Sequence, residues 1–328
     1  MQYRSLGKTG MNVSALSFGA SSLGGIFRNV KEADCVRTVR TALDLGINFM
    51  DVSPYYGLTT AETILGRCLK GIARDRYYLA TKCGRYGADA KDFDFSARRV
   101  TSSVNESLGR LGTDYVDIIQ VHDVEFGDIE QIVDETIPAL LRVKDCGKAR
   151  FVGITGLPLC MFTQIVERLP NDTVNTILSY CHYALNDTSL LEIVPTLQCR
   201  GVGIINASPL SMGLLSLRGA PGWHPAPAEI KQRCRLAAEH CQRHGTDIVK
   251  LAMQFAVSEP SIATTLFGTA NPKNLSQNVA WIAEPIDGEL LTEVHEILQP
   301  IRNLTWPQGR PENNQQDNSA SKASILSI

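Results

Sequence analysis

Short apolar runs alternate with longer segments of helical period along most of this chain. The runs are rich in β-branched and aromatic residues, and their length and composition predict buried β-strands. The segments between them space apolar residues three and four apart, and several end in a glycine suited to the left-handed position after a helix. Eight strands are expected, over residues 15–19, 47–51, 77–81, 115–121, 150–154, 174–179, 201–207 and 262–267. Strands alternating with helices predict a parallel sheet of α/β class.

Two closures of such a sheet are possible, a doubly wound open sheet or a (β/α)8 TIM barrel. The count of eight favours the barrel, and residues 15 to about 283 match the roughly 250 residues typical of that fold. We therefore expect one domain over residues 1–310, with an N-terminal hairpin at 2–13 as a cap and an extra C-terminal helix over 289–304. Residues 311–328 are polar and small, which predicts a disordered C-terminal tail.

Composition excludes several classes of function. Hydrophobic residues make up 44% of the 328-residue chain and charged residues 20%, which is typical of a soluble globular protein. A net charge of −2 without a long basic run argues against nucleic acid or an anionic membrane surface as a partner. No apolar run approaches the roughly 20 residues that span a bilayer, and the first ten residues lack the apolar core of a secretory signal.

The nine cysteines are scattered, and none forms a CxxC pair. Scattered thiols of this kind are typical of reduced cytoplasmic proteins. We therefore expect no disulfide framework and no metal site.

Four polar residues lie at or just after the ends of three consecutive predicted strands. Asp51 and Tyr56 follow the second strand, Lys82 follows the third and His122 follows the fourth. In a parallel sheet these ends meet at one edge, which is where barrel enzymes place their chemistry. Each residue alone is equally compatible with an ordinary position at the rim, but the set of four favours a site.

The chemistry of these side chains predicts a proton-transfer device. A phenol has a pKa of about 10, and a buried ammonium nearby lowers that value. Lys82 suits this task if Asp51 balances its charge, so Tyr56 becomes the expected acid or base. His122 is then available to hydrogen-bond a substrate oxygen. The sequence lacks the G-x-S-x-G motif of an acyl-transfer enzyme.

Several of these segments together resemble the aldo-keto reductase family. They are DVSPYYGLTTAETILG, ATK, YVDIIQVH and ASPLSMGLL, and the resemblance covers about residues 3–307. Longer strings, such as ATKCGRYG, HDVEFGDIEQIVDETIPAL and ILSYCHYALND, resemble members that oxidise L-galactose at its anomeric carbon during ascorbate biosynthesis. The resemblance implies a nicotinamide cofactor and the same four catalytic residues. It also implies a lactone product, with Tyr56 as the general base.

Three alternatives stay open. The substrate is alternatively L-fucose or another aldose. In the second alternative, the protein is an NADPH-dependent carbonyl reductase. In the third, it is a cofactor-binding subunit that catalyses no reaction of its own. The resemblance leaves the oligomeric state undecided between monomer and homodimer.

The resemblance also predicts cofactor contacts, although the chain departs from the family pattern. Thr155 and Gly156 stand in place of a Ser-Asn pair, and Ala207 replaces a tyrosine that stacks on the nicotinamide. The expected contacts are Thr155, Ser208, Leu210, Gly268, Thr269, Asn274 and Asn278. The last four of these lie in the segment 266–279, in which Lys273 is the only basic residue. Relatives that prefer NADP carry several basic residues there. We therefore expect a preference for NAD.

The substrate contacts are expected in the loops after the third and fourth strands. The candidates are Arg85, Tyr86, Asp123 and Phe126, because they follow these strands closely. A Pro-rich segment with Trp223 and His224 follows the seventh strand and is expected to form a lid.

Overall fold

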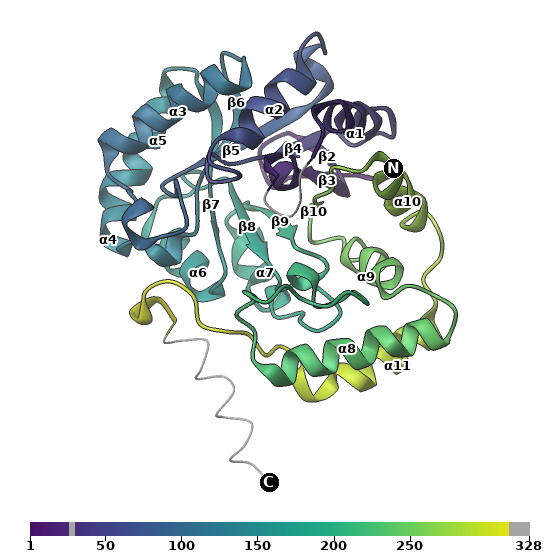
Figure 1. The fold of residues 1–328 in the computed structure, drawn as a ribbon. Helices are drawn as coiled ribbons and strands as arrows, with labels where there is room; N and C mark the ends of the chain where they lie inside the picture. Colours follow the sequence, from purple (N-terminus) through teal and green to yellow (C-terminus); the bar gives the residue numbers. More distant parts are fainter. Residues whose placement is uncertain (26–29, 315–328) are drawn as a thin grey trace.

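Eight parallel strands close into a barrel in the computed structural model, which describes residues 1–25 and 30–314 (Figure 1). This confirms the predicted (β/α)8 barrel. In order around the barrel the strands are β3 (Leu16–Gly19), β4 (Phe49–Asp51), β5 (Tyr78–Cys83), β6 (Val116–Val121), β7 (Ala149–Gly156), β8 (Thr176–Tyr180), β9 (Gly203–Ala207) and β10 (Thr264–Phe267). β10 pairs with β3 and closes the ring.

The barrel has two apolar layers because side chains alternate between the two faces of each strand. Phe49, Ile118 and Ile205 belong to a buried cluster inside the barrel. Their neighbours Met50 and Ile119 belong to a larger cluster between the strands and the surrounding helices. Both faces are buried, which is why the strands are continuous apolar runs in the sequence.

Helices surround the barrel, as the periodic segments predict (Figure 1). They are α1 (Glu32–Asp44), α2 (Thr60–Leu69), α3 (Ala97–Leu111), α4 (Ile129–Gln131), which continues through a π-helical turn (Ile132–Thr136) into α5 (Ile137–Asp145), α6 (Leu159–Arg168), α7 (Leu190–Cys199), α9 (Ile248–Ala256) and α10 (Pro272–Trp281). None of the helices in the described ranges combines the length and the apolar character needed to cross a bilayer.

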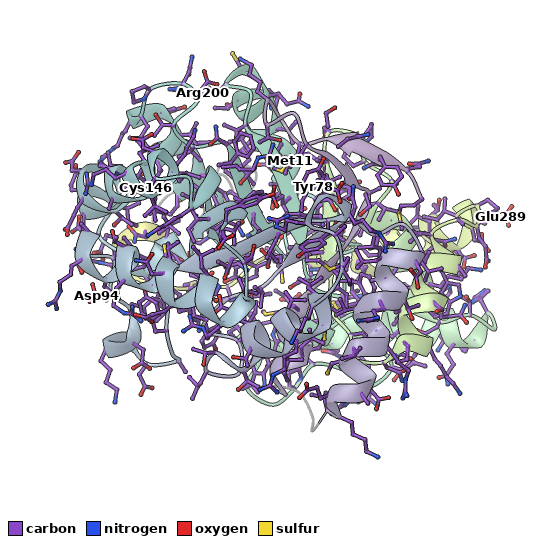
Figure 2. The ribbon with its side chains drawn as sticks, turned by 90° about the horizontal axis from the view of Figure 1, so that it is seen from above. Met11, Tyr78, Asp94, Cys146, Arg200 and Glu289 are labelled. Atoms are coloured by element: carbon purple, nitrogen blue, oxygen red, sulfur yellow. The ribbon has the colours of Figure 1, made fainter. Side chains whose placement is uncertain are left out.

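Two further helices, α8 (Ala228–Arg243) and α11 (Gly288–Leu298), pack side by side on the outside (Figure 1). α11 is the predicted extra C-terminal helix. α8 was not predicted as a second extra helix, and the sequence analysis described only the Pro-rich segment that precedes it. Charged side chains such as Glu289 at the start of α11 lie at the periphery of the molecule (Figure 2), whereas Met11 is buried.

The predicted N-terminal hairpin closes one end of the barrel. β1 (Tyr3–Ser5) pairs antiparallel with β2 (Asn12–Ser14). Leu6, Met11 and Val13 of this hairpin are buried in the same cluster as the inward-facing strand residues. The amide of Lys8 donates to the carbonyl of Gly201, just before β9 begins, which places the hairpin at the amino ends of the strands. The carboxyl ends therefore form the opposite, functional end.

The chain after α11 runs back to the carboxyl ends of the strands. The Asn313 side chain donates to the carbonyls of Glu125 (2.8 Å) and Gly127 (3.1 Å), which follow β6. Residues Pro311–Asn314 form a 3₁₀ turn in which Asn313 is buried. The predicted tail boundary at residue 311 is therefore too early, because these residues are held by the loop after β6. The rest of the predicted tail, 315–328, lies outside the described residues.

Candidate active site

The inward face of three neighbouring strands carries the polar side chains predicted from the sequence. Asp51 lies two residues after the inward-facing Phe49, and Lys82 lies two residues after Ala80. Both therefore point into the barrel at its carboxyl end. His122 follows β6 and is also buried.

Tyr56 comes from the loop between β4 and α2, and a close backbone contact fixes that loop. Gly57 has a φ of +60°, and a Cβ there would lie 2.2 Å from the carbonyl oxygen of Gly24. Only glycine permits this approach. The loop is thereby pressed against the segment after β3, and the Tyr56 hydroxyl reaches Lys82.

The Lys82 ammonium is the centre of a buried hydrogen-bond network. Its Nζ donates to the Asp51 carboxylate, to the Val52 carbonyl (3.0 Å) and to the Tyr56 hydroxyl (3.3 Å). The other carboxylate oxygen of Asp51 accepts a hydrogen bond from the Gln120 side chain (2.8 Å). Burial pulls the pKa of Lys82 down, but the charges of Asp51 and Tyr56 outweigh it and hold that pKa above its ordinary value. Lys82 is therefore a permanent cation.

The pKa of Tyr56 differs from the prediction. Burial raises the pKa of the phenol above its ordinary value, and the neighbouring Lys82 lowers it by less than burial raises it. Asp51 also raises it, because a nearby negative charge disfavours the phenolate. The pKa of Tyr56 is therefore raised and not lowered as predicted, because burial outweighs Lys82 and Asp51 adds to the effect of burial. Lys82 still opposes the effect of burial.

His122 is a neutral imidazole whose Nδ1 contacts Ser53. Burial lowers its pKa well below the ordinary value, and the positive charges of Lys82 and Arg85 lower it further. Its Nδ1 lies 3.0 Å from Ser53 Oγ, and that oxygen already accepts the amide of Tyr55. The Ser53 hydroxyl can accept that amide and donate to Nδ1 at the same time, and in this tautomer the ring carries its proton on Nε2. This N–H is the donor available to a substrate oxygen.

A second buried ion pair lies beside His122. Arg85 donates to the Asp123 carboxylate, and its guanidinium lies 3.8 Å from the centre of the Tyr55 ring. The ring of Phe126 lies 5.6 Å from the same guanidinium. Asp123 Oδ2 is 3.5 Å from His122 Nε2. Three of the four predicted substrate residues, Arg85, Asp123 and Phe126, thus meet next to the catalytic candidates.

Tyr86, the fourth of these candidates, does not join them. Its hydroxyl accepts the amide of Gly84 (3.1 Å), and Arg99 stacks on its ring at 3.9 Å. The Tyr86 side chain thus holds the loop after β5 against α3. The predicted substrate contact of Tyr86 has no support from this geometry.

A model of the aldo/keto reductase family matches residues 15–299. The chain belongs to the aldo/keto reductase family. It is 51% identical to the L-galactose dehydrogenase of Arabidopsis thaliana over 95% of this chain and 99% of that protein. It is 33% identical to the D-arabinose 1-dehydrogenase of Saccharomyces cerevisiae over 76% of each chain. An aldo-keto reductase from Bacillus halodurans, solved in its holo form, superposes with a TM-score of 0.76 at 27% identity and covers 96% of this chain and 99% of its own.

Family membership makes this protein an oxidoreductase and directs attention to the residues predicted to hold its cofactor. Ser208 and Leu210 follow β9, and Gly268 and Thr269 follow β10, so all four lie at the carboxyl end of the barrel. Asn274 lies in the first turn of α10, and Asn278 follows one turn later on the same helix. These positions are compatible with the predicted contacts, which stay predictions.

Thr155 has a different partner in this structure. The Thr155 hydroxyl accepts a hydrogen bond from the backbone amide of Asp123 (3.0 Å) and lies 3.4 Å from Oδ1 of the Asp123 carboxylate. Asp123 has a left-handed backbone with a φ of +54°. Thr155 therefore stabilises the unusual turn that presents Asp123, and its predicted cofactor contact is untested.

Several residues of the site were missed in the sequence. Ser53 and Gln120 support His122 and Asp51, and Gln120 was detectable because it lies on β6, two residues before His122. Glu125 is fully buried and accepts from Gln308 (2.9 Å), and burial raises the pKa of its carboxyl to about 8. Gln308 was not detectable, since it is 183 residues from Glu125.

Proposed function

We propose that this protein oxidises L-galactose at C1 to the lactone with NAD as the hydride acceptor. The observation that carries the proposal is the contact between Tyr56 and Lys82, with Asp51 behind it. The Arabidopsis relative, named for the oxidation of this sugar, is 51% identical over nearly the whole chain. The yeast relative is named for oxidation of another aldose at the same carbon.

The proton path follows from the geometry of three side chains. The C1 hydroxyl of the cyclic sugar gives its proton to the Tyr56 phenolate, while His122 Nε2–H hydrogen-bonds the same oxygen. Lys82 stabilises the phenolate, and Asp51 keeps Lys82 in place. The nicotinamide, when bound, supplies the carbon that accepts the hydride from C1. The sugar thus loses one hydride and one proton: its C1–H and O–H bonds break, and a second C1–O bond forms that makes C1 the lactone carbonyl.

Sugar recognition is assigned to the second ion pair. The buried carboxylate of Asp123 accepts hydrogen bonds from sugar hydroxyls, and Arg85 donates them. Tyr55 and Phe126 flank the Arg85 guanidinium and offer apolar ring faces to the C–H groups of the sugar. Tyr86 is left out of this assignment, because its hydroxyl is bonded within its own loop.

The residues after β10 fit a dinucleotide without a 2′-phosphate. Gly268 is exposed. A Cβ at this position would lie 2.9 Å from the Gly19 carbonyl oxygen, so the chain after β10 passes close to the end of β3. The exposed amide of Asn274 and the half-exposed amide of Asn278 are neutral hydrogen-bonding groups for a ribose. Lys273 is the single basic residue of this segment, and a lysine does not form the bidentate charge-assisted hydrogen bonds with which arginine binds a phosphate. We assign NAD as the cofactor on this basis.

The cofactor assignment is tested by kcat/KM for NAD and NADP at a fixed sugar concentration. NAD is expected to be preferred by more than about tenfold, since the phosphate loses its hydration without a charged partner. Equal efficiency with NADP would contradict the assignment.

The substrate assignment is tested by NADH formation with L-galactose, L-fucose, D-arabinose and D-galactose side by side. L-galactose is expected to give the highest kcat/KM. A higher value for L-fucose or D-arabinose would move the assignment to that aldose. Binding of NAD without oxidation of any of the four sugars would contradict an enzymatic role and favour a cofactor-binding subunit.

The compartment and the assembly also belong to this proposal. The nine cysteines all lie in the described ranges and none of them forms a disulfide there, which suits a reducing compartment, and we assign the protein to the cytoplasm. The residues assigned to the reaction are compatible with a monomer and with a homodimer.

A further inference from the structure

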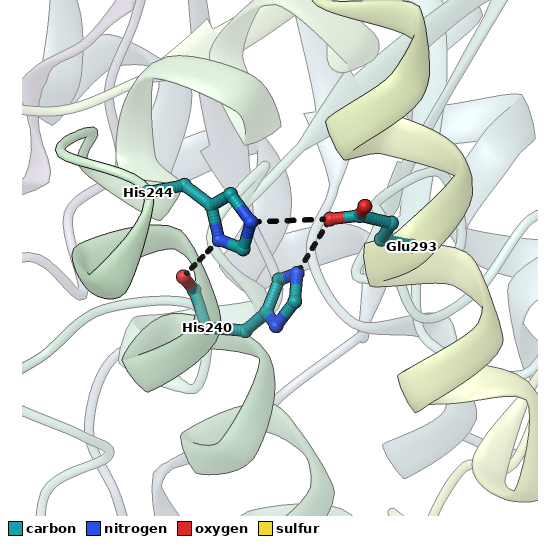
Figure 3. A group of neighbouring side chains, drawn as sticks. All are labelled: His240, His244 and Glu293. Atoms are coloured by element: carbon teal, nitrogen blue, oxygen red, sulfur yellow. Dashed lines mark hydrogen bonds and ion pairs between the residues drawn. The ribbon is translucent and has the colours of Figure 1, made fainter.

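Two histidines and a glutamate meet on the outer surface of the barrel, where α8 packs against α11 (Figure 3). His240 and His244 lie one turn apart on α8, and Glu293 faces them from α11. Each offers one ligand atom, and these three atoms all lie within 4.8 Å of one another. His240 Nε2 is 2.7 Å and His244 Nε2 is 3.6 Å from the same carboxylate oxygen.

The orientation of His244 is the feature that requires explanation. Its Nδ1 lies 3.0 Å from the carbonyl oxygen of His240, and only a protonated nitrogen makes that hydrogen bond. In the neutral ring, Nε2 then carries a lone pair, and this lone pair faces a carboxylate oxygen. Two electron-rich atoms do not attract each other, whereas a cation between them, a proton on Nε2 or a metal ion, binds both.

We propose that His240, His244 and Glu293 bind one divalent transition-metal ion of the zinc class. Such ions bind imidazole nitrogens at about 2.0–2.1 Å and carboxylate oxygens at about 2.0–2.2 Å. The three ligand atoms are close enough for small side-chain rotations to bring each of them to these distances. Two imidazoles favour zinc, nickel, cobalt or copper over magnesium and calcium, which prefer oxygen. Half of each of the His244 and Glu293 side chains is exposed, so water completes the coordination.

The ion links two helices that lie outside the eight-helix ring of the barrel. α8 follows the segment after β9, and α11 precedes the segment that returns to Glu125. Its effect is therefore on stability and not on the chemical step, which lies at the carboxyl ends of the strands. The inference is independent of the substrate proposed above. The prediction of no metal site rested on cysteine spacing and is not informative about a His–Glu site.

The test uses the full chain treated with EDTA and then dialysed, at pH 8. Titration with ZnCl₂ by calorimetry is expected to show one equivalent bound. His240→Ala, His244→Ala and Glu293→Gln should each weaken binding by at least about tenfold, the loss already expected for supporting residues around a metal. Glu289→Gln on the same helix is the matched control and should bind as the wild type does.

Two further measurements separate this site from others. Zinc at about a hundred times the wild-type Kd should raise the Tm of the wild type by about 5 °C, and the same concentration should raise that of the His244→Ala variant by no more than about half as much. Co²⁺ should give weak visible bands of nitrogen and oxygen ligation, without the intense near-ultraviolet band of thiolate ligation that the exposed Cys146 or Cys199 would produce.

Three results would overturn the proposal. They are one-equivalent zinc binding of equal affinity in wild type and all three variants, a thiolate band with Co²⁺, and no Tm increase with zinc. Unchanged kcat in the metal-free enzyme is expected, and a loss of turnover on metal removal would contradict the assignment of the ion to stability.

Discussion

At the scale of single residues, the site depends on where the charge of Lys82 acts. The ammonium is buried and contacts both Asp51 and the Tyr56 hydroxyl. The four catalytic candidates were predictable because each lies at a strand end. The direction of the Tyr56 pKa was not predictable, since it depends on how far burial outweighs a partly balanced charge. His122 was predictable as a donor, but its contact with Ser53 requires the folded loop.

Replacing Lys82 by Met should shift the pH profile of oxidation to higher pH. The base form of Tyr56 is the phenolate, so activity rises as pH rises toward the pKa of the phenol. Lys82 lowers that pKa, and its loss raises it further. A rise of one unit reduces the phenolate fraction about tenfold at pH 7.5, so kcat should fall at least about tenfold there.

The measurement is kcat from pH 6.5 to 10.5 for both enzymes. Lys70→Met, at an exposed position after α2, is the control and should leave the profile unchanged. A profile of Lys82→Met that is lower at every pH but has the same midpoint would show that Lys82 does not act on the Tyr56 pKa.

At the scale of elements, short connections set the positions of the reacting groups. The loop from β4 to α2 carries Ser53, Tyr56 and Gly57, and its contact with Gly24 presses it onto the loop after β3. Strand positions were predictable to within a few residues from their apolar runs. The packing of α8 was not predictable, because this helix lies against α11 and no pattern in the sequence reveals that partner.

Replacing Gly57 by Ala should reduce kcat by roughly tenfold or more. The added Cβ would lie 2.2 Å from the Gly24 carbonyl, so the loop must move and the Tyr56 hydroxyl must leave Lys82. A displacement of about 1 Å in a reacting group is enough to cost about 100-fold.

Gly71→Ala is the matched control for this variant. Gly71 also has a positive φ, of +79°, but nothing lies within 4 Å of its added Cβ. Both variants carry the backbone strain of about 1–2 kcal/mol in the left-handed region, and only Gly57→Ala should lose kcat. Equal kcat in the two variants would show that the contact with Gly24 does not position Tyr56.

At the scale of the whole molecule, stability and chemistry lie at opposite ends of the barrel. The N-terminal hairpin fills the amino end with Leu6, Met11 and Val13, and the polar residues occupy the carboxyl end. The barrel, the cap and the extra C-terminal helix followed from counting periodic segments. The contribution of residues 303–314 to the carboxyl end was not predictable, because their hydrogen bonds to Glu125 and Asn186 join segments far apart in the chain.

Leu6→Ala should destabilise the protein without changing the chemical step. Leu6 is fully buried in the cap, and truncating a buried leucine costs about 2–5 kcal/mol. The guanidinium midpoint of unfolding should fall, while kcat of the folded enzyme at 25 °C stays within about twofold of wild type. A large loss of kcat together with an unchanged unfolding midpoint would contradict the separation of the two ends.

The most direct measurement is the rate of NADH formation from L-galactose by wild type and by Tyr56→Phe. The substitution preserves the ring and removes the hydroxyl that contacts Lys82, so binding is retained while proton transfer is lost. The account predicts a fall in kcat of at least about 100-fold with an unchanged Kd for NAD. A Tyr56→Phe enzyme with near-normal kcat would contradict the role of this phenol as the proton acceptor.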